Sequence, residues 1–436
     1  MKIAIIGAGS PYVPVIIDSL LLNKRIETLS EIILIAPSNK NISVIGDFCV
    51  ELIKIRKRDT KIILKNDIDD TISGSDLVIN LFRIGGMQSR SIEENLGKEF
   101  EIIGQESQGL GGFSSALRNI EQLKGIASKV TKYAPYTKVL NLTNPAGMMT
   151  LASIKLGLDT IGFCDAPYNL SKSIAKFVNI PLTDLEITYI GLNHLGWVVD
   201  VCRRNNSLLN EIINNKKINE FIQILKLANI TPPKYMQTIM RSLNAIPSPY
   251  VLYYYQPDAI RQVLSKSPIT RGEEVEKINE KIFEKYRQKD LLTWPQYVYE
   301  NRSGYLLGEA LSEFLADLFF QSKEYTHIIC MPNNNANNSR IIANLGNESV
   351  IETSVKIVNG KIIPLKNNIE IGGQIKALIT TLSEYEMLTV NAALRKDKLM
   401  AFQALATHPH INSIDKAGNL IERIFHEFKY YLHDFK

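Results

Sequence analysis

The chain has 436 residues, of which 45% are hydrophobic and 22% charged, and its formal net charge is +5. These values are typical of a folded globular protein with two or three domains, and they exclude a disordered chain. The charge is too small for this length to favour nucleic-acid binding. No apolar run is long enough for a membrane span or a signal peptide. The four cysteines lie far apart without CxxC spacing, which predicts a reducing, cytoplasmic location.

The N-terminus combines a short apolar strand with a glycine turn. Ile3–Ile6 form the apolar run, Gly7 and Gly9 interrupt it, and a helical pattern follows from Val13 to Leu22. Glycines let the backbone approach a phosphate closely, and the free N–H groups at a helix start favour an anion. Gly7, Gly9 and Ser10 are therefore candidate nucleotide-binding residues. A simple strand-to-helix turn remains the alternative, because the third glycine of the full dinucleotide fingerprint is missing.

Further β-rich runs alternate with helical patterns along the first part of the chain. We expect strands at Glu31–Ile35, Lys61–Leu64, Asp76–Phe82, Val139–Leu142 and Asp159–Phe163. This alternation predicts an α/β fold with a Rossmann-type, doubly wound parallel sheet.

The second strand lacks the acidic residue that usually holds the adenosine ribose of a dinucleotide. Residues 36–40 read Ala-Pro-Ser-Asn-Lys instead. Ser38 and Asn39 are candidates to bond the ribose, and Lys40 is a candidate to meet a 2′-phosphate. The choice between NAD and NADP therefore stays open.

Polar residues follow the later strands, at the sheet edge where doubly wound folds bind ligands. Arg83, Arg90 and Glu106 follow the strand that ends near Phe82. Two neighbouring arginines indicate an anionic substrate, with a surface salt bridge as the alternative for either one alone. Cys164 follows a later strand, and with His194 it could form an open thiolate–imidazole metal site. Separate buried packing of these two residues is the alternative.

Seven motifs together resemble those of the family 4 glycoside hydrolases. They are GAGSPYVP at the start, RIGGMQSR at 83–90, IGQESQGLGG at 103–112, NLTNPAGMMT at 141–150, FCDAP at 163–167, GLNHLGW at 191–197 and PSPYVLYYYQPD at 247–258. Their order and spacing agree with the family over roughly the first 280 residues. The family is an exception to the two-carboxylate rule of glycosidases, so the lack of an obvious acid pair does not count against it.

The resemblance implies an enzyme that uses NAD and Mn²⁺ or another divalent metal. In such enzymes NAD⁺ removes hydride from sugar C3, a base removes the C2 proton, the C1–O bond breaks by elimination, water adds, and NADH reduces C3 again. By motif position, Cys164 and His194 are the metal ligands, Tyr250 is the base and Asp165 is the acid.

Substrate-binding residues are assigned by the same resemblance. The sugar phosphate is assigned to Arg90 and Arg271, since guanidinium groups suit a dianion. Asn144 is assigned to the sugar hydroxyls, and Arg83 and Glu106 complete the substrate site.

The resemblance favours hydrolysis of 6-phospho-β-glucosides, such as cellobiose 6-phosphate, to glucose 6-phosphate. The TNPAGMMT segment resembles the β branch, whereas Asp165 after the cysteine resembles the α branch. A 6-phospho-α-glucosidase therefore stays open, as do a lactate- or malate-type dehydrogenase and a non-catalytic nucleotide-binding relative.

We expect two domains, a Rossmann NAD-binding domain at 1–167 and a substrate, metal and oligomerisation domain at 168–436. The second is expected to be mixed and mainly helical α+β, similar to the C-terminal domain of lactate dehydrogenase. The resemblance implies a homodimer or homotetramer. Asn335 replaces a glycine of the family in the loop at Asn333–Asn338, and the His408-Pro409-His410 segment is interpreted as a solvated turn rather than a metal site.

Overall fold

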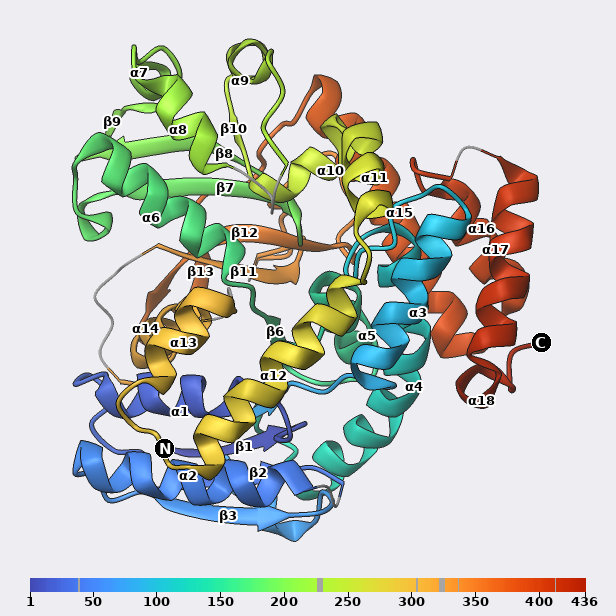
Figure 1. Cartoon of the computed structure of the whole chain (residues 1–436). Coiled ribbons are helices and arrows are strands. Elements are labelled where there is room, and N and C mark those ends of the chain that lie inside the picture. The colour runs from blue at the N-terminus through green and yellow to red at the C-terminus, as the bar shows by residue number, and fades with distance from the viewer. Residues whose placement is uncertain (38–39, 226–229, 303–304, 321–325, 336, 412) are drawn as a thin grey trace.

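The computed structural model describes the chain except for residues 38–39, 226–229, 303–304, 321–325, 336 and 412 (Figure 1). Its strands belong to one 13-stranded sheet with the central order β10-β8-β7-β12-β11-β6-β5-β4-β1-β2-β3. The strands are β1 Lys2–Ile6, β2 Glu31–Ile35, β3 Lys61–Lys65, β4 Leu77–Asn80, β5 Lys138–Asn141, β6 Thr160–Gly162, β7 Glu186–Leu192, β8 Leu195–Arg203, β9 Asn206–Ser207, β10 Ile246–Pro247, β11 His327–Pro332, β12 Val350–Val358 and β13 Lys361–Pro364.

Helices cover both faces of the sheet and extend from its edges. The α-helices are α1 Val13–Leu22, α2 Lys40–Arg56, α3 Gly86–Glu99, α4 Gly109–Tyr133, α5 Ala146–Lys155, α6 Ala166–Val178, α7 Leu209–Ile213, α8 Ile218–Ile224, α9 Met236–Leu243, α10 Leu252–Tyr255, α11 Pro257–Lys266, α12 Arg271–Arg287, α13 Trp294–Asn301, α14 Tyr305–Phe319, α15 Gly373–Arg395, α16 Lys398–Thr407, α17 Ile414–Glu427 and α18 Lys429–Leu432. Short 3₁₀ turns are η1 Asp70–Ile72, η2 Leu182–Asp184 and η3 Pro249–Val251.

The N-terminal half is a parallel sheet in the order β3-β2-β1-β4-β5-β6. Its central strands are apolar on both faces because helices cover both sides. In β1, Ile3 and Ile5 pack in one core with α1 and α2, while Ala4 and Ile6 pack in a second core with α4 and α5. The predicted Rossmann-type doubly wound sheet is confirmed, and the predicted limits of α1 are those observed.

The sheet continues past β6 with antiparallel strands. β11 pairs with β6 through Cys330 and Gly162, and β12, β7, β8 and β10 follow in antiparallel order. The second half is therefore mixed and mainly helical, as predicted. Because one sheet runs through both halves, the division at residue 167 stays a prediction.

The β7–β8 hairpin is the main element that the sequence did not predict. Asn193 and His194 form its two-residue connection, and His194 has a left-handed backbone with φ of 62°. Few non-glycine residues adopt this conformation. The hairpin thus presents His194 at the end of the sheet.

The solvated-turn prediction for His408-Pro409-His410 is wrong. His408 is buried, and its ring lies 4.7 Å from that of Tyr385 on α15. His410 Nε2 lies 3.0 Å from the carbonyl oxygen of Tyr253. His408 is buried because Tyr385 on α15 and Tyr254 on α10 pack beside it, and local sequence does not show these contacts.

Other predictions fall near residues that are not described. Ser38 and Asn39 lie outside the described residues, so their role toward a ribose stays a prediction, as does that of Lys40. In the Asn333–Asn338 loop, Asn338 rather than Asn335 has a positive φ, of 58°. Among the described helices, none combines the length and apolar character that crossing a lipid bilayer requires.

Candidate active site

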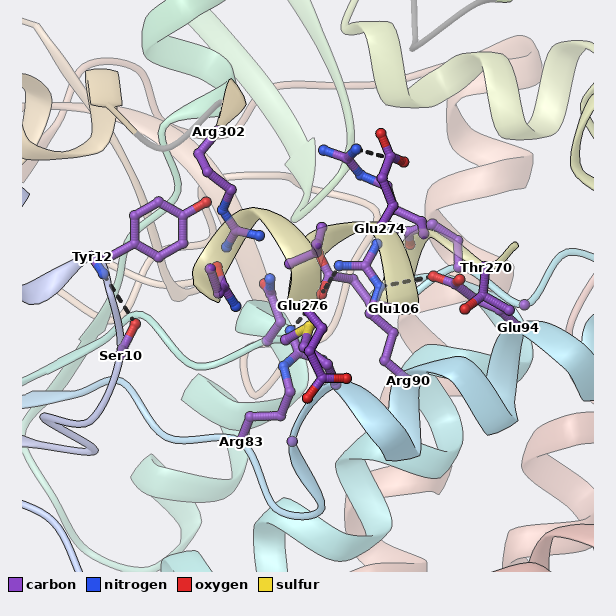
Figure 2. Close-up of a pocket in the computed structure, with 18 of the residues that line it drawn as sticks. Ser10, Tyr12, Arg83, Arg90, Glu94, Glu106, Thr270, Glu274, Glu276 and Arg302 are labelled. Atoms are coloured by element: carbon purple, nitrogen blue, oxygen red, sulfur yellow. Dashed lines mark hydrogen bonds and ion pairs between the residues drawn. The ribbon is translucent and has the colours of Figure 1, made fainter. Parts of the chain in front are cut away.

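One cavity of about 1940 Å³ joins the carboxyl end of the parallel sheet to the β7–β8 connection, η3 and α12 (Figure 2). It is lined by all twelve residues that the sequence singled out as site residues, which are Gly7, Gly9, Ser10, Arg83, Arg90, Glu106, Asn144, Cys164, Asp165, His194, Tyr250 and Arg271. These residues come from many separate segments, so their convergence is a product of the tertiary fold. Their individual roles stay predictions.

The glycine turn after β1 lies at one end of the cavity. Gly7 has a φ of 90°, and a Cβ there would lie 2.4 Å from the carbonyl oxygen of Leu81. The N–H groups of Gly7 and Ala8 donate to the carbonyl of Ile35 at 2.8 and 3.0 Å, which ties the turn to β2. The backbone is thus held open where α1 begins, and this cradle fits the pyrophosphate of a dinucleotide.

Tyr12 and Arg302 also line the cradle, and the sequence did not single them out. The Arg302 guanidinium lies 4.6 Å from the centre of the Tyr12 ring, and the two face each other in Figure 2. In the described part of the chain, Nε of Arg302 has no hydrogen-bond partner. Arg302 follows α13, almost 300 residues after the glycine turn, so no local pattern could have found it.

Glu106 lies between two arginines at the centre of the cavity. Arg83 Nη2 and Arg90 Nη1 both donate to its Oε2, the latter at 3.1 Å. Burial alone would raise the pKa of Glu106, but the charges of Arg90 and Arg83 outweigh it and lower the pKa to about 2. Glu106 is therefore an anion that holds the two arginines together.

A second carboxylate fixes Arg90 from the other side. Glu94 accepts from Arg90 Nε at 2.8 Å and from the backbone N–H of Gly272 at 3.1 Å. It therefore joins α3 to the start of α12. Arg271 lies at the rim, where it pairs with Glu274 at 2.7 Å. Asn144 lines the cavity, while its backbone carbonyl accepts from Asn119 Nδ2 at 3.0 Å.

Cys164 and His194 meet on the wall of the cavity. Cys164 follows β6 and His194 lies in the β7–β8 connection, and Sγ lies 3.4 Å from Nε2. Burial lowers the pKa of His194 to about 4, so its imidazole is neutral and keeps a lone pair for a metal. Burial, Glu352 and Asp165 raise the pKa of the Cys164 thiol, so a nearby cation is needed to form the thiolate.

This thiol–imidazole pair fits a divalent metal. Among the described residues, no group of three or more His, Cys, Asp or Glu side chains could hold a metal ion. Two protein ligands leave coordination positions for water or substrate oxygens, which is typical of catalytic rather than structural sites.

Tyr250 lies flat on the ring of His194. The two ring centres are 3.7 Å apart with an angle of 6° between the planes. The placement follows from β10, which pairs with β8, and from the Ser248 N–H, which donates to the Gly196 carbonyl at 2.9 Å. Burial raises the pKa of Tyr250, and the nearby Cys164 raises it further. A cation bound beside Cys164 would instead lower the pKa of Tyr250.

Asp165 is the remaining acid near this group. Burial raises its pKa to about 6. A carboxyl group with that pKa holds its proton more firmly than an ordinary aspartate, which suits a proton donor near neutral pH.

Comparisons with known proteins agree with this geometry. The family model described as family 4 glycosyl hydrolase matches residues 2–180, and that of its C-terminal domain matches residues 189–411. The chain is 29% identical to the 6-phospho-beta-glucosidase BglT of Thermotoga maritima, over 99% of each chain. It is 26% identical to 6-phospho-alpha-glucosidase 1 of Lacticaseibacillus paracasei, over 64% of this chain and 65% of that one.

A solved structure extends the comparison to three dimensions. It is the Thermotoga maritima 6-phospho-beta glucosidase with manganese, NAD⁺ and glucose-6-phosphate. The TM-score is 0.83 and the identity 27%, over 99% of each chain. The resemblance seen in the sequence motifs is confirmed, and the chain belongs to family 4 of the glycosyl hydrolases.

Proposed function

We propose that this glycosyl hydrolase cleaves 6-phospho-β-glucosides to glucose 6-phosphate, with NAD and a divalent metal such as Mn²⁺ as cofactors. A relative that matches over 99% of the chain is named a 6-phospho-beta-glucosidase, and its structure holds these cofactors with glucose-6-phosphate. The cradle at Gly7 and the pair at Cys164 and His194 fit the two cofactors.

The observation that carries the proposal is the grouping of Cys164, His194 and Tyr250 in the same cavity as the glycine cradle. When bound, NAD supplies a hydride acceptor for sugar C3 and the metal supplies a Lewis acid for the neighbouring sugar oxygens. A hydrolase without redox chemistry would not need the cradle, and a dehydrogenase of the lactate or malate type would not need the metal pair.

The side chains of the chain itself move the protons. Tyr250 takes the proton from C2 through its phenolic oxygen, and its position against His194 keeps that oxygen near the metal ligands. Asp165, adjacent to Cys164, gives its proton to the leaving oxygen. Both groups are partly buried and line the cavity, so a bound sugar would displace water from them and strengthen their interaction with the reacting atoms.

Arginines recognise the two phosphate-bearing ligands. Arg90 and Arg83, held by Glu106, face the sugar phosphate, and Arg271 approaches it from the rim. Arg302 lies beside the cradle and stabilises the pyrophosphate of NAD. Asn144 holds the sugar hydroxyls.

The test is release of p-nitrophenol from p-nitrophenyl β-glucoside 6-phosphate, under anaerobic conditions with Mn²⁺ and a thiol. We expect turnover that requires both NAD⁺ and Mn²⁺ and leaves no net NADH. Turnover without NAD⁺, or net NADH without glycoside cleavage, would contradict the proposal, and the second result would indicate a dehydrogenase.

A 6-phospho-α-glucosidase is the second candidate. Asp165 after the cysteine favours it, and a 6-phospho-alpha-glucosidase is among the relatives. The α-anomer and the unphosphorylated glucoside are therefore assayed beside the β-substrate. Faster turnover of the α-anomer would replace the β assignment without changing the cofactors. A cytoplasmic location and a homodimer or homotetramer complete the proposal.

A further inference from the structure

A buried carboxylate lies behind the Cys164 and His194 pair. Glu352 is on β12, which pairs with β7, and its backbone partner is Gly191. Its side chain is 1% exposed and is not part of the cavity lining. Burial raises the pKa of Glu352 to about 7. A buried carboxyl group is costly to a fold, so its contacts call for a physical reason.

The contact that gives this reason is with Asn193. Asn193 precedes His194 in the β7–β8 connection and is 5% exposed. Its Nδ2 donates to Glu352 Oε1 at 3.0 Å. Asn193 is bonded directly to His194, so this contact fixes the connection from which the His194 imidazole reaches Cys164, with Nε2 lying 3.4 Å from Sγ.

An asparagine amide can face a neighbour with its N–H₂ group or with its oxygen. Glu352 Oε1 accepts from Nδ2, and it can do so whether or not Oε2 carries a proton, so Glu352 selects the orientation in which the N–H₂ group points toward it. Cys330 Sγ on β11 lies 3.6 Å from the same oxygen and holds Glu352 in place.

We propose that Glu352 is a positioning residue that acts through Asn193 to hold the β7–β8 connection that carries His194, and so places the imidazole beside Cys164 for the metal. Partners behind metal ligands commonly fix ligand orientation in this way. The inference rests on the proposed function in one respect, that Cys164 and His194 hold a divalent metal.

A double-mutant cycle on the full chain tests whether Glu352 acts through Asn193. Glu352→Met removes the acceptor at similar volume, and Asn193→Ala removes the amide. Mn²⁺ affinity is measured without substrate, from the free-ion electron paramagnetic resonance signal. In the native background, we expect Glu352→Met to weaken Mn²⁺ binding by about 10-fold or more. In a chain that already carries Asn193→Ala, we expect the same change to weaken binding by less than about 2-fold, because the effects of coupled residues do not add.

Co²⁺ gives a second readout that a general loss of stability would not move. The thiolate-to-cobalt absorption band reports the Cys164 bond directly, and we expect it to shift or weaken in Glu352→Met and in Asn193→Ala alike. NAD⁺ affinity, which depends on the other end of the cavity, checks that each variant is folded. Should Glu352→Met not fold, Glu352→Gln replaces it, with about a 3-fold loss expected because a glutamine amide allows both orientations of Asn193.

Asp317→Asn is the control. Asp317 on α14 is another buried carboxyl group, at 2% exposed, and its Oδ2 lies 2.6 Å from His327 Nε2, away from Asn193 and from the cavity lining. We expect native Mn²⁺ affinity from this variant. Equal losses at Glu352 and Asp317, additive losses in the cycle, or no loss at Glu352 would each overturn the inference. If Cys164→Ala abolishes binding while the cycle is additive, only the positioning role fails; if the native protein binds no Mn²⁺, the proposed function fails as well.

Discussion

The two ends of the cavity are built in different ways. At the cofactor end, Gly7, Gly9 and Ser10 are nearly consecutive, and the backbone provides the cradle. At the reaction end, Cys164, His194 and Tyr250 come from three segments and act through side chains. The first end is therefore a local product of a strand–turn–helix unit, whereas the second exists only when β6, β8 and β10 are placed in one sheet.

This difference predicts that the two ends fail independently. A change at the reaction end should remove metal binding or proton transfer and leave NAD⁺ binding intact. A change at the cradle should weaken NAD⁺ and leave the thiol–imidazole pair intact. Glu106 lies between the two ends of the cavity, and a change at Glu106 should affect the stability of the fold instead.

Cys164→Ala is expected to have the largest effect. It removes one of the two proposed protein ligands, and a bound metal would contribute several kcal/mol of charge stabilisation, so turnover should fall by about 1000-fold or more. Mn²⁺ titration and p-nitrophenol release measure the two losses. NAD⁺ affinity should stay native. Cys202→Ala on β8 is the control, since Cys202 contacts Asp200 and not the cavity, and its activity should match the native chain.

Tyr250→Phe separates proton transfer from binding. Loss of a general base is expected to lower kcat by about 100- to 10,000-fold with little change in KM. Exchange of the C2 hydrogen with solvent deuterium should disappear. Tyr255→Phe removes a hydroxyl that accepts from Trp197 at 3.2 Å and does not line the cavity. Comparable losses in both variants would show that the aromatic cluster is only structural.

Gly7→Ala tests the cofactor end. The added Cβ would meet the Leu81 carbonyl at 2.4 Å on a backbone with φ of 90°. The left-handed backbone costs about 1–2 kcal/mol for an alanine, and NAD⁺ affinity should fall by about 10-fold, measured by NADH fluorescence. Gly74→Ala has a similar φ of 69° but no atom within 4 Å of the Cβ, so it should retain native NAD⁺ affinity. Unchanged affinity in Gly7→Ala would disprove the cradle.

Glu106→Gln is expected to change the pH dependence of the free energy of unfolding more than it changes that free energy at one pH. The folded pKa of about 2 lies below the ordinary value of 4.5. The ion cluster therefore stabilises the fold above pH ~4.5 and loses this contribution as the pH falls toward 2. For the native chain about 1 kcal/mol should be lost between pH 7 and pH 3.5. Urea unfolding at pH 7 and pH 3.5 measures this loss of unfolding free energy, and Glu106→Gln should lack it. An equal loss in the native chain and the variant would contradict its assignment to Glu106.

The local sequence was sufficient to predict the elements that depend on a pattern within a short stretch of residues. The apolar run before Gly7 and the helical pattern from Val13 to Leu22 fixed β1 and α1, because burial on two faces and the 3.6-residue period are readable in a short window. Residue patterns along the chain supplied eight of the twelve candidate site residues, and the motif resemblance supplied the family and added Asn144, Asp165, Tyr250 and Arg271. The aromatic neighbours of His408 could not be found in the same way, since they lie on distant elements.

The sequence by itself determined the Rossmann sheet, the glycine turn and the residue types needed for the chemistry. Only the tertiary structure decided that Tyr250 stacks on His194, that Arg302 faces Tyr12, and that Glu352 holds Asn193. Each of these contacts joins residues more than 50 positions apart. Their formation depends on strand order and register, which many residues set jointly and no single stretch encodes.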